Sequence, residues 1–167
     1  EHFASRTAMD IEGLGESLIN QFVDMGFLKT VADIYLLKEK RETLINIERL
    51  GEKSVDNLLN AIEKSKSQPF SKVLFALGIR YVGAGAAKKI ISHFQSLNAL
   101  MNATEEEIEF VHEIGPSISK SIRKFFSDDA NLHTIELLKK AKLCFEEKTT
   151  VIKDSHLKGK TFVITGT

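Results

Sequence analysis

The stretch IEGLGESLINQF, residues 11–22, is the first of four copies of one pattern. In it, Gly15 directly follows an apolar residue, and further apolar residues lie four positions before the glycine and seven positions after it. The pattern recurs around Gly51, Gly83 and Gly115, at intervals of 36, 32 and 32 residues. A repeat of this period is typical of small helical units. Each copy therefore predicts a tight glycine turn that opens an amphipathic helix.

The apolar positions keep the same offsets from the glycine in every copy, so we expect them to face a shared core. Helices are predicted over about 16–25 and 52–66, after the turn at 81–85, from Pro116 onward, and over about 131–143. Two short helices are predicted between Gly26 and the second turn. The repeated apolar residues are Ile11, Leu14 and Phe22; Ile47, Leu50 and Leu58; Ile79, Val82 and Ile90; and Val111, Ile114 and Ile122.

The composition favours an all-α fold built on one hydrophobic core. The chain has 167 residues, of which 43% are hydrophobic and 28% are charged, as in ordinary globular proteins. Two prolines and no tryptophan leave long stretches free for helix. The formal net charge is zero, so the basic excess that usually marks a nucleic-acid-binding protein is absent. Helix-end amides and local lysines can nevertheless hold phosphates without such an excess.

Cys144 is the only cysteine, so neither an intrachain disulfide nor a multi-cysteine metal site is predicted. A lone cysteine fits a reducing cytosol, and we expect a cytoplasmic protein. No apolar run approaches the length of a membrane span, and no signal-peptide pattern is present. The first residues, EHFASRTAMD, include no starting methionine, which predicts a piece of a longer chain.

The glycine turns are candidate anion sites. Glycine permits positive φ, which we expect at Gly51, and lets a ligand approach the backbone closely. The following helix offers unpaired amides and the positive end of its dipole. Such contacts grip sugar-phosphate and do not read bases. The glycines could instead merely connect helices, but four copies in register favour binding. The predicted binding residues are Gly13, Gly15, Glu16, Arg49, Gly51, Lys53, Ser54, Arg80, Gly83, Gly85, Lys88, Gly115, Ser117 and Lys120.

The turns resemble the helix-hairpin-helix family of non-specific DNA-binding motifs. The family's full pattern is an apolar residue, any residue, a glycine, an apolar residue and a second glycine. Only the first copy has this pattern. The other copies replace the first glycine with Arg49, Tyr81 and Glu113. The acidic Glu113 predicts that the fourth hairpin is the weakest phosphate site. In this family, paired motifs meet the two DNA strands across the minor groove. The resemblance therefore implies four tandem motifs arranged as two pseudo-symmetric pairs.

The segments HFASRTAMDIEGLGE, LFALGIRYVG and LKGKTFVITGT further resemble the bacterial NAD-dependent DNA ligases. This resemblance implies a helix-hairpin-helix domain over 1–148, a linker over 149–156 and the β-prone start of a BRCT domain over 157–167. It also implies that the whole protein uses NAD, magnesium and a structural zinc, and seals nicks in replication and repair.

The chain has no K-x-D-G motif, so the AMP-accepting lysine of that family is missing. We therefore expect a monomer that binds nicked or duplex DNA, has no catalytic residue, metal or cofactor of its own, and is inactive alone. Three alternatives stay open: a helix-hairpin-helix DNA glycosylase, a stand-alone DNA-binding or scaffold module, and a protein-interaction array.

Overall fold

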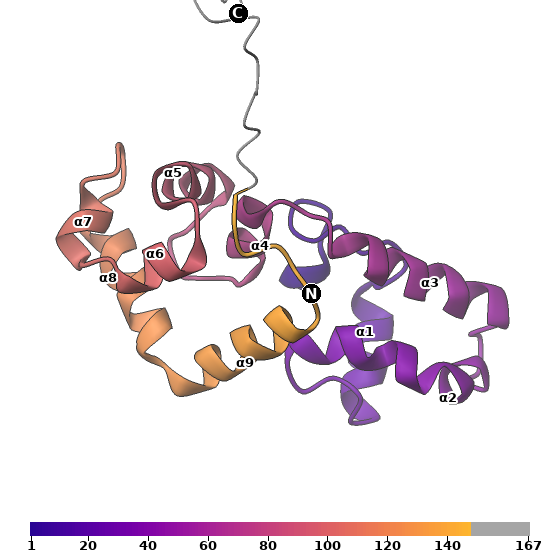
Figure 1. Ribbon diagram of the computed structural model, residues 1–167. Helices are drawn as coiled ribbons and strands as arrows, with labels where there is room; N and C mark the ends of the chain where they lie inside the picture. The colour runs from indigo at the N-terminus through magenta and orange to yellow at the C-terminus, as the bar shows by residue number, and fades with distance from the viewer. Residues whose placement is uncertain (148–167) are drawn as a thin grey trace, which may run out of the picture.

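The computed structural model describes residues 1–147, and all the regular elements in that range are helical (Figure 1). The predicted linker and BRCT segments lie outside the described residues. In chain order the elements are η1 (His2–Ala4), α1 (Glu16–Asp24), η2 (Val31–Lys40), α2 (Arg41–Ile45), α3 (Glu52–Ser65), α4 (Phe70–Ala76), α5 (Ala84–Phe94), α6 (Leu97–Asn102), α7 (Glu105–Glu109), α8 (Pro116–Ser127) and α9 (Asp129–Lys140); η1 and η2 are 3₁₀ helices.

The four hairpin helices begin where the repeated glycines predict. Helices α1, α3, α5 and α8 begin directly after Gly15, Gly51, Gly83 and Gly115. The apolar residue seven positions after each glycine is buried in every copy: Phe22, Leu58, Ile90 and Ile122. The two short helices predicted before the second turn are also present, although the first of them, η2, is a 3₁₀ helix.

One hydrophobic core joins the two halves of the repeat. In Figure 1, α1 to α3 lie at one end of the molecule and α5 to α8 at the other, with α4 and α9 between them. Helix α9 packs against both η2 and α8, and α4 packs against both η1 and α5. The N-terminal η1 is fixed to α4 by His2, whose ring packs edge-on against Phe75 at 4.7 Å and whose Nε2 donates to the Phe75 carbonyl oxygen over 2.8 Å.

The segment after α9 folds back onto the start of α6. Phe145 packs against Phe70, with ring centroids 5.9 Å apart, and its carbonyl oxygen accepts from the Leu97 amide at 3.0 Å. Cys144 is half-buried, with its Sγ 3.6 Å from the Lys66 carbonyl oxygen. These contacts extend the packed part of the chain beyond the end of α9.

Candidate nucleic-acid interface

The four turns share one backbone geometry. In each, the amide of the residue just before the glycine donates to the carbonyl oxygen three positions earlier, which closes a β-turn. The donor and acceptor pairs are Leu14 and Ile11, Leu50 and Ile47, Val82 and Ile79, and Ile114 and Val111, at 3.3, 3.0, 3.0 and 3.0 Å. The third residue of each turn has positive φ: Gly13 at 89°, Arg49 at 71°, Tyr81 at 69° and Glu113 at 64°.

The prediction of a positive φ at Gly51 is wrong. Gly51 has φ −88°, and Gly15, Gly83 and Gly115 lie between −82° and −95°. The physical reason is that each of these glycines is the N-cap of its helix, a position with an extended backbone. The left-handed residue of the turn is the one two positions earlier, where only the first copy has a glycine, Gly13.

The hairpin helices begin without a side-chain cap. At all four glycine N-caps, no side chain accepts a hydrogen bond from the first-turn amides. Three other helices are capped, since Ser96, Thr104 and Asp128 each accept from an amide of α6, α7 or α9, whereas α2 and α4 also begin without a side-chain cap. The hairpin turns therefore present open amides at the positive ends of helix dipoles. Pro116 at the first position of α8 leaves that helix one amide short.

Nothing inside the protein requires glycine at these N-caps. A Cβ atom added at Gly15, Gly51, Gly83 or Gly115 would meet no atom within 4 Å, and the φ angles suit any residue. Serine or aspartate would also cap the helix better than glycine does. The space in front of each N-cap is thus open to a ligand that approaches the amides closely.

The predicted side chains gather on the first turns of these helices and in the turns before them. Glu16 is the first residue of α1, and Gly85 and Ser117 are the second residues of α5 and α8. The exposed predicted residues are Gly13, Gly15, Glu16, Arg49, Gly51, Lys53, Ser54, Arg80, Gly83, Gly85, Lys88, Ser117 and Lys120, whereas Gly115 is half-buried.

Charge is distributed unevenly among the hairpins. Residues 64–104 contain no aspartate or glutamate but six basic residues, Lys64, Lys66, Lys72, Arg80, Lys88 and Lys89. The third hairpin lies within this segment. The first hairpin instead carries Glu12 and Glu16, with no lysine or arginine between Arg6 and Lys29. The zero net charge of the chain therefore conceals a basic stretch that includes α4, the third hairpin turn and α5.

Within each pair, the helix of the first hairpin faces the turn of the second. Gln21, six residues after Gly15, lines a groove of about 430 Å³ together with Arg49, two residues before Gly51. At the equivalent positions of the second pair, Lys89 forms an ion pair with Glu113. The same offsets thus face each other in both halves, so the two pairs are built alike.

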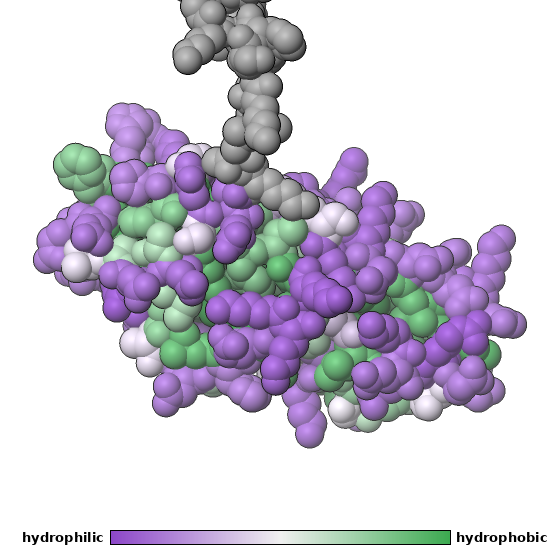
Figure 2. All heavy atoms as spheres, in the orientation of Figure 1, coloured by the Kyte–Doolittle hydropathy of each residue, from purple (hydrophilic) through white to green (hydrophobic). Residues whose placement is uncertain are grey.

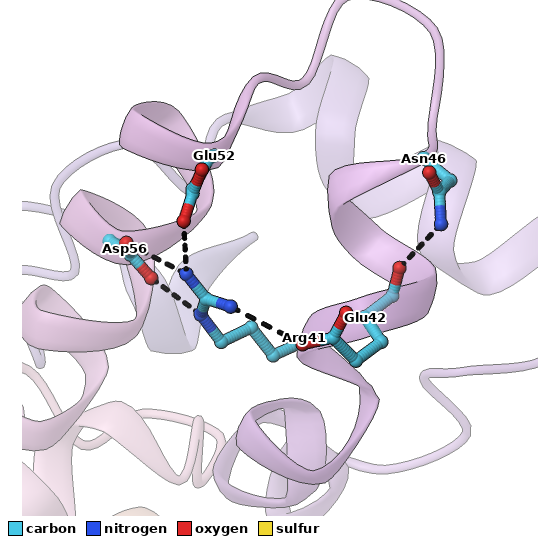
Figure 3. A network of polar contacts seen from close by, with 5 residues as sticks. All are labelled: Arg41, Glu42, Asn46, Glu52 and Asp56. Carbon is cyan, nitrogen blue, oxygen red and sulfur yellow. Dashed lines mark hydrogen bonds and ion pairs between the residues drawn. The ribbon is translucent and has the colours of Figure 1, made fainter.

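Arg41 is a structural cation that the sequence analysis missed. Its Nε and Nη2 atoms donate to the two carboxylate oxygens of Asp56 at 2.7 and 3.0 Å, and Nη2 also donates to Glu52 at 3.1 Å (Figure 3). Arg41 is the first residue of α2, so this network ties α2 to the first turns of α3. It also partly neutralises Glu52, an acid at the helix end where the second hairpin presents its amides.

The Arg41 network predicts that the stability of the fold depends on pH. Hydrogen bonds from Arg41 hold the pKa of the Asp56 carboxyl below its ordinary value of 3.8. A pKa that is lower in the folded state than its ordinary value stabilises the protein at pH values above that ordinary pKa. This stabilisation is lost as the pH falls through the pKa of the folded state. We expect Asp56→Asn to lower the melting temperature at pH 7, with the difference from the parent shrinking below about pH 4. Melting curves of both proteins across this range test this; a difference as large at pH 3 as at pH 7 would contradict it.

Within 1–147, no group of three or more histidine, cysteine, aspartate or glutamate residues is arranged to hold a metal ion. In the same part of the chain, no helix has both the length and the apolar character needed to cross a membrane.

Comparison with known proteins matches both halves to helix-hairpin-helix families. Residues 5–64 match the family described as a SAM-like helix-hairpin-helix tandem, and residues 72–135 match the helix-hairpin-helix motif family. The first range contains the first two hairpins and the second contains the last two. The two matches therefore divide the chain between the pairs.

Relatives with similarity along nearly the whole chain are DNA ligases. The ligase of Acetivibrio thermocellus is 47% identical over 169 residues, covering 99% of this chain and 25% of the ligase. The ligase of Methylacidiphilum infernorum is 47% identical over 166 residues, covering 99% of this chain and 24% of the ligase. The ligase of Marinomonas sp. is 44% identical over 167 residues. This chain spans about a quarter of the length of these curated relatives, and it corresponds to the helix-hairpin-helix DNA-binding region of bacterial DNA ligases.

Proposed function

We propose that this chain binds nicked or duplex DNA without regard to base sequence, as the DNA-holding part of an NAD-dependent DNA ligase that seals nicks in replication and repair. The observation that carries the proposal is the set of four uncapped glycine N-caps with open space in front of them. A phosphate oxygen can reach the backbone amides there because no Cβ stands in the way. Each hairpin of a pair would grip one strand across the minor groove.

Side chains around the turns would reinforce these backbone contacts. Lys53 and Ser54 lie in the first turn of α3, Lys88 lies in α5, and Ser117 and Lys120 lie in α8, all exposed. These groups can donate to phosphates but do not read bases. Among the hairpins, the third has the most favourable charge, whereas the fourth has Glu113 in its turn and lacks one amide because of Pro116.

The ligation chemistry itself would belong to other parts of the longer protein. The sequence contains no K-x-D-G motif and a single cysteine, so it supplies neither the AMP-accepting lysine nor a four-cysteine zinc site. We therefore assign NAD, magnesium and zinc to segments outside this chain and expect the chain alone to join no nicks. The proposal also includes a domain over 1–148, a linker over 149–156 and a BRCT start over 157–167. We propose that the protein is monomeric and cytoplasmic.

The salt dependence of DNA binding tests this function. If four to eight phosphates are contacted, log K should fall against log salt with a slope of roughly −4 to −7. Fluorescence anisotropy with a labelled nicked duplex, measured at several salt concentrations, gives the slope. A second duplex with permuted base sequence serves as the control and should bind equally well. A slope near zero would instead favour a protein-interaction array, and a strong preference for one sequence would contradict phosphate-based binding.

A further inference from the structure

Tyr81 combines an exposed aromatic ring with an unfavourable backbone conformation. It is the third residue of the third hairpin turn, its φ is 69°, and 59% of its surface is exposed. Positive φ is disfavoured for bulky residues, and the equivalent position of the first hairpin is Gly13. An exposed ring gains little from packing inside the protein. The fold itself therefore gives no reason for a tyrosine at this position.

A neighbouring cation lies beside the ring. The guanidinium of Arg80 lies 4.9 Å from the centre of the Tyr81 ring. Such a pair presents a flat apolar surface beside a positive charge. Two residues later Gly83 presents the uncapped amides of α5, and the surrounding segment 64–104 carries no acidic residue.

A partner for this surface must be negatively charged and must also offer flat apolar groups. Duplex DNA meets both requirements, because deoxyriboses and base edges lie between its phosphates in the minor groove. We propose that Tyr81, positioned by Arg80, packs against deoxyriboses and base edges of the minor groove beside the phosphate bound at the third hairpin. This inference rests on the proposed DNA binding and adds a side-chain contact to it.

Aromatic exposure alone would not support this assignment, as Phe110 shows. Phe110 is 84% exposed, at the end of α7 in the fourth hairpin. It directly follows α7, whose sequence EEEIE contains four glutamates. Those charges repel DNA, so we assign no DNA contact to Phe110. It therefore provides a matched control for Tyr81.

The tyrosine content of the chain allows a direct spectroscopic test. The sequence has two tyrosines and no tryptophan, and the other tyrosine, Tyr35, is buried against Ser65. In a Tyr35→Phe background, the intrinsic fluorescence comes from Tyr81 alone. Contact of the ring with base edges should quench this emission when a nicked duplex is added. Tyr81→Phe should remove the signal and keep the affinity.

Affinity measurements on two further variants test the energetic contribution. Tyr81→Gly and Tyr81→Asn both tolerate the positive φ of the turn, so the far-UV circular dichroism should be unchanged. We expect each to weaken binding of the nicked duplex about fivefold or more. Phe110→Ala should bind as the parent does.

The outcomes separate this inference from the proposed function. Unchanged fluorescence and unchanged affinity of the folded Tyr81 variants, with a parent that binds DNA, would overturn the role of Tyr81 and leave the proposed function intact. A loss in Phe110→Ala equal to that in Tyr81→Gly would also overturn it, because the charge argument would fail. A parent that binds no DNA would refute the proposed function itself.

Discussion

Gly83→Asp is expected to weaken binding to duplex DNA by roughly tenfold or more while the helical fold stays intact. Gly83 is the N-cap of α5 with φ −82°, and a Cβ there meets no atom within 4 Å. Aspartate is among the preferred N-cap residues, so it should stabilise the helix. Its carboxylate would occupy the amides that we assign to a phosphate and would repel that phosphate. Thermal unfolding and fluorescence anisotropy of the same protein measure the two effects separately.

Two control variants make this experiment specific. Thr104→Asp adds the same charge at the N-cap of α7, where Thr104 already accepts from the Glu107 amide. We expect that variant to bind DNA almost as the parent does. Gly83→Ser introduces a Cβ and a capping hydroxyl without a charge. Its loss of affinity should lie between those of Gly83→Asp and Thr104→Asp. Equal losses in Gly83→Asp and Thr104→Asp would mean that net charge, and not the third hairpin, controls binding.

The helix starts could be predicted from the sequence because the signals for them are local. The glycine, the apolar residue before it and the apolar residue seven positions later lie within one turn and one helix. Phe22 and Ile122, for example, were placed in the core by this spacing alone, and both are buried. The arrangement in two pairs is what the family resemblance implies, and the family matches split the chain between the second and third hairpins.

Features that depend on contacts between distant residues escaped the sequence analysis. The partner of Arg41, Asp56, is 15 residues away on another helix, and Lys89 pairs with Glu113 across two hairpins. Neither pairing has a periodic signal. The wrong prediction of positive φ at Gly51 has a different cause: in the last three turns the left-handed residue is Arg49, Tyr81 or Glu113, and none of them is a glycine.

The basic segment 64–104 could have been found from the sequence. The net charge of the whole chain is zero, but the charge of each hairpin separates the basic third hairpin from the acidic first one. This unevenness predicts that a polyanion is attracted to α4, the third hairpin turn and α5 more strongly than to the other hairpins. It also means that salt should weaken contacts of the third hairpin most strongly.

Phe22→Ala is expected to destabilise the fold by about 3–5 kcal/mol, a large share of the roughly 5–15 kcal/mol that stabilises a typical domain. Phe22 is 0% exposed and occupies the apolar position seven residues after Gly15. Its ring centroid lies 6.2 Å from that of Phe27, and its carbonyl oxygen accepts from the Phe27 amide at 2.9 Å. Truncation would leave a cavity in the core that both pairs share.

The neighbouring residue provides the matched control for this loss. Val23 is 51% exposed on the same helix, α1, so Val23→Ala should change the free energy of unfolding by less than about 0.5 kcal/mol. Urea unfolding followed by circular dichroism gives both values. Because the repeat assigns Phe22 to the core and leaves Val23 outside the pattern, similar costs for the two substitutions would show that the glycine register does not determine which residues hold the fold together.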